Sequence, residues 1–564
     1  MIERVGKGAL WASMVLVVVA AVLAVVIHPR WLWAEVVLVP AVVVGVWDLA
    51  QTRHSILRNF PVIGHFRFLL EGVGPELHQY LVESDTDGRP FDRDTRSLIY
   101  QRAKSVPDKK PFGTEIDVYA AGYTWLAHSI APRPVPDDPV AALRVVVGGE
   151  QCDQPYSLSV LNISAMSFGA LGGHAVRAMN KGAKEGHFAH DTGEGGISRY
   201  HREHGGDLIW QIGTGYFGCR APDGTFDPDL FARTATDPQV KMIEIKVSQG
   251  AKPGHGGILP AAKVTDEIAE ARHVPAGRDV FSPTYHQAFS TPDEMIDFVV
   301  TLRELSEGKP VGFKICIGDP REFIAIAKAM LERDTYPDFV VVDGGEGGTG
   351  AAPLEFSDHL GMPLVEGLML VQNVLIGAGI RDRLRVGASG KMVTASAIAQ
   401  SMALGADWCN SARAFMMAVG CIQAQQCHTN RCPVGVATQD ERLQRALVVD
   451  DKATRVRQFH HNTIHALAEI VAAMGLDHPG QLEPDHVLRR IDQSKVMTFG
   501  ELHPTLASGA FLDGTAPERF QRAWDNARRD RFRPATGRYH GAERQAPLAG
   551  PPRGARLTLP GDAG

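Results

Sequence analysis

Three cysteines lie within twelve residues of a chain that has only seven, and their spacing is the first sign of chemistry. Cys421, Cys427 and Cys432 are separated by five and then four residues, and a proline follows the last of them. Closely spaced thiolates from one segment can bind a single iron–sulfur cluster, and three ligands suit a three-iron cluster. A chance grouping of half-buried cysteines is the alternative, but the polar neighbours His428 and Asn430 favour a ligand loop. Such a cluster carries single electrons and indicates a redox enzyme.

Two glycine-rich segments each follow an apolar, strand-like run and indicate a site for a phosphate-bearing cofactor. Glycine lets the backbone approach a phosphate or a flat ring closely, although a tight turn is the plain alternative for either segment. No G-x-G-x-x-G motif opens a helix after the first strand, so a Rossmann nicotinamide domain is not supported. The candidate cofactor contacts in the two segments are Asp343, Gly344, Gly347, Gly348, Thr349, Gly350, Gly387, Gly390 and Lys391.

A third segment, residues 246–257, carries two lysines and a histidine among glycines. Lys246 ends an apolar run, and Lys252 follows six residues later. Cations on such a loop could bind an anionic substrate or stabilise the negative charge of a reduced flavin, whereas solvated surface lysines are the alternative. Glu194 is flanked by glycines and could act as an acid, a base or an orienting group, or could be a simple turn residue.

The elements that must position these residues alternate between short apolar strands and helices. Such alternation predicts a parallel sheet with crossover helices, and about eight strands in about 260 residues fit a (β/α)₈ barrel whose strand ends carry the chemistry. The expected strands are Ser159–Ala165, Leu208–Ile212, Met242–Val247, Val311–Ile317, Phe339–Val342, Leu384–Gly387 and Ala406–Asn410, and the expected helices include Pro292–Leu305 and Pro320–Glu332.

The whole chain has 564 residues, too many for one ordinary core, so we expect one large domain with attachments. We expect a lead-in over residues 51–155, the barrel with its cysteine loop over 156–440, and an extension over 441–564 with an amphipathic stretch at 453–473. The Arg-, Pro- and Gly-rich sequence beyond about 530 is expected to be mobile. The net charge of −6 gives no reason to expect nucleic acid, and scattered, odd-numbered cysteines favour a reducing compartment.

The N-terminus, residues 1–50, predicts a transmembrane hairpin. Ala9–Ile27 is an uncharged run of 19 residues, long enough to cross a bilayer, and a second apolar run follows from Trp31 to Trp47. Arginine and lysine residues lie outside both runs, so the positive-inside rule places both ends, and the barrel, on the cytoplasmic side of a cell membrane. A cleaved signal peptide is the alternative, but its apolar region would be shorter.

Taken together, several segments resemble the FMN-binding synthase domain of glutamate synthase. The resemblance covers about residues 155–440, in the order of that family. Its elements are Ser164-Ala-Met-Ser-Phe-Gly169, Thr192-Gly-Glu-Gly-Gly196, the lysine loop Ile245–Gly254, Asp343–Pro353 and Gly420–Gln439. The resemblance implies a (β/α)₈ barrel that holds FMN beside a 3Fe-4S cluster. It implies that reduced FMN passes hydride to 2-iminoglutarate, made from 2-oxoglutarate and ammonia, to give glutamate.

The resemblance also implies roles for individual residues. The cluster ligands would be Cys421, Cys427 and Cys432. Lys246 and Arg272 would bind substrate carboxylates, and Glu194 would lie near the reacting centre. The implied FMN contacts are Met166, Ser167, Gln249, Lys252 at the flavin border, and the two glycine-rich segments.

The chain differs from the family pattern at several points. His255 stands where the family has Glu, and Ile258 stands where it has a substrate-side Gln. There is no glutaminase domain and no cysteine after Met1, so we do not expect this chain to make ammonia from glutamine. Three hypotheses follow: a membrane-anchored oxidoreductase of the glutamate synthase type, an FMN dehydrogenase acting on another amine or 2-oxo acid and coupled to a membrane electron carrier, or a non-catalytic flavoprotein scaffold. The sequence does not identify the electron donor.

Overall fold

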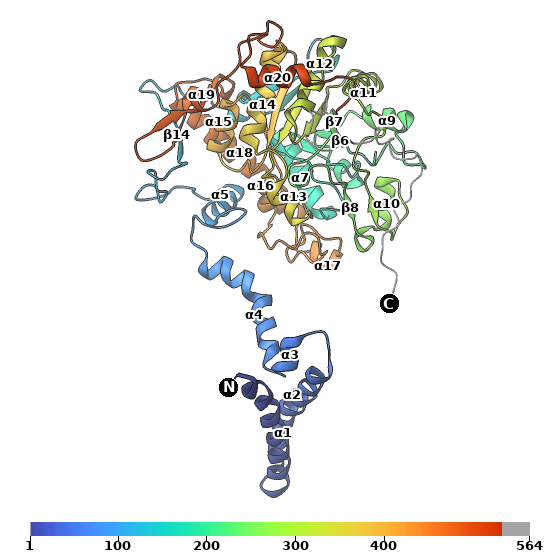
Figure 1. The fold of residues 1–564 in the computed structure, drawn as a ribbon, viewed down its shortest axis with the longest axis vertical. Helices are drawn as coiled ribbons and strands as arrows, with labels where there is room; N and C mark the ends of the chain where they lie inside the picture. The colour runs from blue at the N-terminus through green and yellow to red at the C-terminus, as the bar shows by residue number, and fades with distance from the viewer. Residues whose placement is uncertain (1, 533–564) are drawn as a thin grey trace, which may run out of the picture. The chain divides into compact units, whose positions relative to one another are not determined.

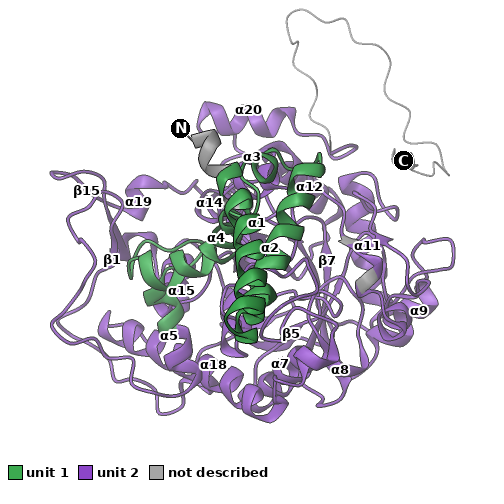
Figure 2. Ribbon diagram, turned by 90° about the horizontal axis from the view of Figure 1, so that it is seen from below, with its two compact units in different colours: residues 1–98 green, residues 99–564 purple. Residues whose placement is uncertain are grey.

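The computed structural model describes residues 2–532, except for the side chains of residues 2–6, Ala9, Ile258 and Ala262. Most of the tail that we expected to be mobile therefore lies outside the described residues. The chain divides into two compact units, residues 1–98 and residues 99–564, which Figure 2 distinguishes by colour. The boundaries expected at residues 50, 155 and 440 remain predictions.

The first unit is helical, and its first two long helices pack against each other as a hairpin (Figure 1). Its elements are α1 (Ile2–Val26), α2 (Leu32–Ala50), α3 (Ser55–Asn59), α4 (Gly64–Leu77) and the π-helical turn His78–Val82. The segment Pro29–Ala50 is long and apolar enough to cross a membrane, and Leu10–Val26 is a shorter apolar helix. Both expected apolar runs are thus helical, while a second span and the orientation remain predictions.

The end of the hairpin is tied to the start of α4 by one buried carboxylate. Asp48 accepts a hydrogen bond from the backbone N–H of Val62 at 2.9 Å, and its two oxygens lie 2.9 and 3.0 Å from Nε2 of His65. These contacts satisfy the carboxylate where it is excluded from solvent.

The second unit contains a closed barrel of eight parallel strands, which confirms the predicted (β/α)₈ class. Its strands are β4 (Leu161–Ile163), β5 (His190–Asp191), β6 (Leu208–Ile212), β7 (Val240–Lys246), β10 (Val311–Ile315), β11 (Phe339–Asp343), β12 (Arg385–Ser389) and β13 (Trp408–Ser411). The seven expected strands are all present. Strand β5 was not predicted because it is only two residues long and both residues are polar.

The chain outside the barrel strands is largely helical. Helix α5 (Arg93–Ala103) crosses the boundary between the two units, and the second unit then contains α6 (Pro139–Ala142), α7 (Gly173–Gly186), α8 (Arg199–Arg202), α9 (Pro228–Ala235), α10 (Asp266–Arg272), α11 (Pro292–Leu305), α12 (Pro320–Arg333), α13 (Leu354–His359), α14 (Leu364–Gly377), α15 (Ala395–Ala403), α16 (Arg413–Ala418), α17 (Glu441–Gln444), α18 (Val449–Ala473), α19 (Phe499–Leu502) and α20 (Glu518–Asn526). Helix α11 begins where predicted because the Thr291 hydroxyl accepts from Glu294 N and Pro292 occupies the first turn. The expected amphipathic stretch forms most of α18, which packs against α7, α15 and α16.

The end of the barrel where the strands begin is filled with apolar side chains. A hairpin of β2 (Arg144–Val147) and β3 (Tyr156–Ser159) packs there. The core at this end consists of Val147, Leu158, Ala189, Ile209, Met242, Phe339, Val341 and Trp408. This packing leaves the opposite end, where the strands finish, to carry polar side chains.

The longest excursion from the barrel runs from the end of β7 to the start of α11. It contains the lysine loop, the antiparallel pair β8 (Ile258–Leu259) and β9 (Val280–Phe281), and helix α10. A small separate sheet is formed by β1 (Thr124–Leu126), β14 (Val487–Arg490) and β15 (Val496–Thr498).

Candidate active site

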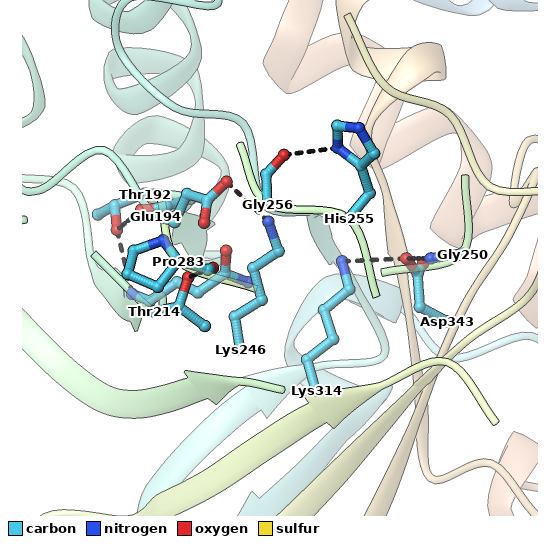
Figure 3. Close-up of polar contacts among 12 residues, drawn as sticks. Thr192, Glu194, Thr214, Lys246, Gly250, His255, Gly256, Pro283, Lys314 and Asp343 are labelled. Carbon is cyan, nitrogen blue, oxygen red and sulfur yellow. Dashed lines mark hydrogen bonds and ion pairs between the residues drawn. The ribbon is translucent and has the colours of Figure 1, made fainter. Parts of the chain in front are cut away.

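A carboxylate and an ammonium group face each other where two barrel strands end. Lys246 is the last residue of β7, and Glu194 lies in the glycine-rich turn after β5. Lys246 Nζ lies 2.8 Å from Glu194 Oε1, and Figure 3 shows the two side chains pointing toward each other. Their side chains are only 13% and 18% exposed, so the ion pair is largely protected from solvent screening.

The charges around Glu194 determine its protonation state. Burial on its own would raise the pKa of Glu194, but the charges of Lys246, Arg272 and Lys252, with the Lys246 hydrogen bond, lower it below its usual value. Burial and the neighbouring Lys246 charge lower the pKa of Lys252. At neutral pH the site therefore holds one carboxylate within a group of cations, an arrangement with positive charge left to bind an anion.

Arg272 supplies the third cation from the last turn of α10. Its guanidinium is buried, donates from Nη2 to Phe168 O at 3.2 Å, and lies over the ring of Phe217 at 5.0 Å from the centroid. A Cβ on Gly169 or Gly195 would lie 3.2 Å from Nη2, so these glycines make room for the group. Arg272 Nε has no hydrogen-bond partner among the described residues, which leaves a buried donor for a ligand.

His286 holds the backbone of Lys246 in place through a hydrogen bond. Its Nε2 lies 2.8 Å from Lys246 O, and its Nδ1 lies 3.2 Å from the hydroxyl of Tyr216. Because a carbonyl can only accept, Nε2 carries the proton and Nδ1 accepts from Tyr216. Burial lowers the pKa of His286 to about 4, so the ring is neutral at neutral pH and acts as a support for the strand end.

A pocket opens beside the Lys246–Glu194 pair. Its walls are formed by Glu194, Thr214, Lys246, Val247, Ser248, Gln249, Lys252, Gly254, His255, Gly256, Gly257, Pro283 and Thr284. His255 Nδ1 lies 2.8 Å from the carbonyl oxygen of Gly256, and its ring makes an edge contact with Phe356. The structure thus brings together the predicted residues Glu194, Lys246, Gln249 and Lys252. The side chain of Ile258, in contrast, lies outside the described part of the chain.

The first glycine-rich segment meets the lysine loop. Gly250 N donates to Asp343 Oδ2 at 2.7 Å, and a Cβ on Gly250 would overlap Gly344 O (Figure 3). Met166 and Ser167 lie on the other side of the site, where a Cβ on Gly193 would be 2.6 Å from Ser167 N. These close backbone approaches explain the glycines in physical terms.

The remaining predicted cofactor residues divide between the loop surface and the barrel interior. Gly348, Thr349 and Gly350 are exposed, and a Cβ on Gly348 would lie 2.8 Å from Nε of Arg413. Gly387, in contrast, lies within β12, where a Cβ would lie 2.7 Å from the indole of Trp408. Core packing explains the glycine at that position. Gly347 lies within the first segment, where a Cβ would be 3.0 Å from Gly344 O, and Gly390 lies beside Glu346 of the same segment. Lys391 follows in the left-handed region with a φ of 50°.

The three cysteines lie close enough to influence one another. Burial, together with the neighbouring Cys427 and Cys432 thiols, raises the pKa of Cys421 to about 12. Burial and Cys432 also raise the pKa of Cys427. Lys263, which the sequence did not point to, donates from Nζ to Cys427 O at 2.9 Å and to Ala437 O at 3.3 Å. It fixes the loop beside the excursion that carries the lysine loop.

Two cations of the site could not be placed from the sequence. Lys314 of β10 lies with its Nζ 3.7 Å from Asp343 Oδ2, inside the barrel (Figure 3). Arg413 donates to Glu346 O at 2.9 Å. Both are lone cations within or just after apolar strands, so only the closure of the barrel reveals their place.

Two buried histidines predict that the barrel loses stability in acid. Both ring nitrogens of His190 are buried without a partner among the described residues, and burial lowers its pKa to about 3. Between pH 6.5 and 3 the unfolded chain therefore binds a proton at His190 that the folded protein does not bind. The free energy of unfolding should fall through this window by up to about 1.4 kcal/mol per pH unit for His190, and His286 adds a similar loss between pH 6.5 and 4.

Replacing His190 by Leu should flatten this pH dependence, as measured by denaturant unfolding of the detergent-solubilised protein between pH 7 and 5. His465→Leu is the matched control because that side chain is 57% exposed on α18. An unchanged slope in His190→Leu would contradict the assignment.

The closed parallel barrel, with its charged pocket at the ends of the strands, places the chain among the (β/α)₈ enzymes. Comparison with known proteins makes the assignment specific. Residues 139–477 match the family described as "Conserved region in glutamate synthase". The chain is 37% identical to the glutamate synthase large subunit-like protein YerD of Bacillus subtilis, over 81% of this chain and 93% of that protein.

More distant relatives agree. The chain is 33% identical to the archaeal-type glutamate synthase [NADPH] of Thermotoga neapolitana and 34% identical to the archaeal glutamate synthase [NADPH] of Methanocaldococcus jannaschii. Each alignment covers 56% of this chain and 59% of the relative, so the chain spans about three-fifths of those proteins. A solved mandelate oxidase aligns with 72% of this chain and 98% of its own at 14% identity and a TM-score of 0.41, which adds nothing to the assignment.

The chain belongs to the glutamate synthase family, and it is an oxidoreductase.

Proposed function

We propose that this protein reduces 2-iminoglutarate, formed from 2-oxoglutarate and ammonia, to glutamate with FMN and a 3Fe-4S cluster. The observation that carries the proposal is that Lys246, Lys252 and Arg272 all lie close enough to Glu194 to lower its pKa, and that Lys246, Lys252 and Glu194 line one pocket. A 2-oxo dicarboxylic acid presents two carboxylates, and paired cations in a largely buried site bind such a substrate strongly. The family relationship supports the same substrate class.

The residues at the pocket fit an FMN. A Cβ on Gly250 would overlap Gly344 O and one on Gly348 would meet Arg413, so glycine lets these loops pack closely beside the pocket. The exposed backbone of residues 348–350 would be free to meet a phosphate. Met166, Ser167, Gln249 and Lys252 would border the ring. The bound flavin would supply the hydride. The protein would contribute binding, orientation and electrostatics.

The protein side chains would divide the remaining work. Arg272 would bind a substrate carboxylate through its free Nε and its fork of N–H donors, and Lys246 would bind the second anionic group. Glu194, kept ionised by its three cationic neighbours, would orient the ammonium of Lys246 and accept a hydrogen bond from a substrate N–H.

The cysteine loop fits a cluster ligand set. Cys421, Cys427 and Cys432 would be the ligands, and the cluster would pass single electrons. Gln439 Nε2 donates to Gly169 O at 3.1 Å and to Leu171 O at 3.0 Å, which ties the loop to the chain beside Ser167. A rigid connection of this kind favours electron transfer between the two groups.

We further propose that residues 1–50 anchor the barrel to the cytoplasmic face of a cell membrane as two spans. The length and composition of Pro29–Ala50 support one span, and the helical Leu10–Val26 supports the second. The electron donor would be a separate protein or carrier.

A second candidate function keeps the same cofactors with another amine or 2-oxo acid as substrate. The observation that favours it is His255, whose imidazole lines the pocket where the family pattern has Glu. An imidazole and a carboxylate present different charge to a substrate, so the two candidates differ in substrate preference.

The two candidates can be separated by anaerobic reduction of the purified, flavin-bearing protein followed by 2-oxoglutarate with ammonium. Flavin reoxidation, followed by absorbance, is expected for the glutamate synthase reaction. Ile258→Gln should speed reoxidation because an amide side chain can hydrogen-bond a polar substrate, and a good hydrogen bond to a charged group contributes about 1.5–3 kcal/mol. The second candidate would be favoured if 2-oxoglutarate reoxidised neither the native protein nor Ile258→Gln, while another 2-oxo acid did reoxidise the flavin.

A further inference from the structure

Five polar side chains are buried inside the barrel beneath the pocket, one from each of five neighbouring strands. They come from β5, β6, β7, β10 and β11, which lie in this order around the barrel. The five residues are Asp191, Gln211, Glu244, Lys314 and Asp343, and none is more than 6% exposed. We call them the interior cluster. Barrel interiors are otherwise filled with apolar side chains, as the opposite end of this barrel is, so the cluster needs an explanation.

Two members of the interior cluster, Lys314 and Asp343, form an ion pair. Lys314 Nζ lies 3.7 Å from Asp343 Oδ2, and the same oxygen accepts from Gly250 N at 2.7 Å. Burial lowers the pKa of Lys314, but the charges of Asp343, Glu244 and Asp191 outweigh it and raise the pKa above its usual value. Lys314 is therefore permanently charged. Sheet pairing sets it beside Lys246, whose side chain lines the pocket.

Asp191 and Glu244 are two further carboxyl groups, close enough to share a hydrogen bond. Asp191 accepts from Gly193 N at 2.9 Å, and Glu244 Oε1 accepts from Gln211 Nε2 at 2.6 Å. Glu244 Oε2 is buried, and no described donor is placed to bond it. Burial and the Glu244 charge raise the pKa of Asp191, and burial raises that of Glu244.

Charge counting shows what this arrangement can hold. The interior cluster has three carboxyl groups and one ammonium, and Asp343 already takes the close contact with Lys314. Two carboxyl groups side by side in a dry interior do not both ionise, because their repulsion adds to the cost of desolvation. One proton between them removes the repulsion.

We propose that Asp191 and Glu244 share one proton as a carboxylic acid–carboxylate pair, and that the pair binds a second proton when negative charge arrives next to Lys314. The source of that charge rests on the proposed function. If reduction of a bound flavin added negative charge there, an O–H bond would form on the remaining carboxylate with a proton from solvent. Once that charge was removed, the O–H bond would break and the proton would return to solvent. By taking up this proton, the Asp191–Glu244 pair offsets negative charge that Lys314 alone would otherwise have to balance. Asp191 and Glu244 are positioning residues.

The shared proton can be seen without turnover. Infrared spectra of the full-length protein in H₂O and D₂O at pH 7.5 should show the carbonyl band of a buried, protonated carboxyl group. Labelling aspartate with ¹³C at its carboxyl carbon in the unmodified protein reports whether Asp191 carries the proton, so this measurement does not depend on a variant that folds. Glu244→Gln and Asp191→Asn should each remove the band, because the remaining carboxyl group then ionises beside Lys314.

Asp207→Asn is the matched control, because Asp207 lies outside the interior cluster and is bonded to the hydroxyl of Tyr156. This control should keep the band. Absence of a protonated carboxyl band in the native protein, or its survival in both cluster variants, would overturn the shared proton. Because the band is expected in protein without flavin as well, failure of the FMN proposal would be seen separately, as missing flavin.

The second proton is tested by the pH dependence of the flavin midpoint potential. Each additional proton taken up with two electrons steepens that dependence by about 30 mV per tenfold change in proton concentration. The native protein should therefore show a slope steeper than Glu244→Gln by up to this amount, and proton uptake on photoreduction should be correspondingly larger. Equal slopes and equal uptake would overturn the charge-compensation role, even if the infrared band behaves as expected.

Discussion

Arg272→Lys is expected to lower kcat/KM for the anionic substrate roughly ten- to hundred-fold although the positive charge is kept. Arg272 lies buried over Phe217, uses one N–H group on Phe168 O, and keeps Nε free of any described partner. A lysine cannot reproduce a planar fork that bonds Phe168 and a carboxylate together. Loss of one charge-assisted hydrogen bond raises the free energy of the transition state by about 1.5–3 kcal/mol. That increase corresponds to the expected roughly ten- to hundred-fold fall in kcat/KM.

The measurement is stopped-flow reoxidation of reduced flavin over a range of substrate concentrations. Arg199→Lys is the matched control, since that arginine is 68% exposed beside α10 and pairs with Glu267 on the surface. The control should change the rate by less than twofold, because Arg199 does not line the pocket and its exposed ion pair contributes only about 0–1 kcal/mol to stability. Equal kinetics for Arg272→Lys and native protein would show that the substrate does not reach Arg272.

The sequence predicted the frame of this site better than its interior. Long apolar strands such as β6 and long helices such as α11 have clear patterns, and their bounds were predicted to within a residue or two. The strand β5 was missed because a strand of two residues, His190 and Asp191, has no period to detect.

Chain segments that carry motifs were also predictable, because glycine clusters and paired lysines stand out locally. The partners that complete the site were not. Lys314 is the only charged residue of β10, and Glu244 lies two residues before Lys246 in β7, so nothing in the sequence shows that barrel closure sets them around one point. In the same way, Gly387 looked like part of a cofactor loop, while the structure shows it against Trp408 in the core. Which side chains meet inside the barrel depends on pairing between strands that are far apart in the sequence, and such pairing cannot be predicted from a single sequence.

Cys427→Ser is expected to remove the iron and sulfide of the anaerobically purified protein while leaving its flavin in place. Changes around a metal site typically weaken binding by roughly 10- to 100-fold, and removal of one of three ligands should exceed that. The loop itself should persist, since Lys263 bonds the backbone carbonyl of residue 427 and Gln439 bonds Gly169. The cluster and flavin would therefore be lost independently.

Because the flavin should stay bound when the cluster is lost, the variant also tests the path of the electrons. Reduction by a one-electron donor should fail in Cys427→Ser, because the proposed cluster is the entry point for single electrons, whereas flavin reduced chemically should still be reoxidised by substrate. Cys152→Ser is the matched control: this buried thiol donates to Gly308 O, and a hydroxyl can do the same far from the cysteine loop. Native protein free of iron and sulfide, or a Cys427→Ser variant that keeps both, would contradict the ligand assignment. The three cysteines would then be structural thiols, and the raised pKa values of Cys421 and Cys427 favour the inert, neutral form of those two.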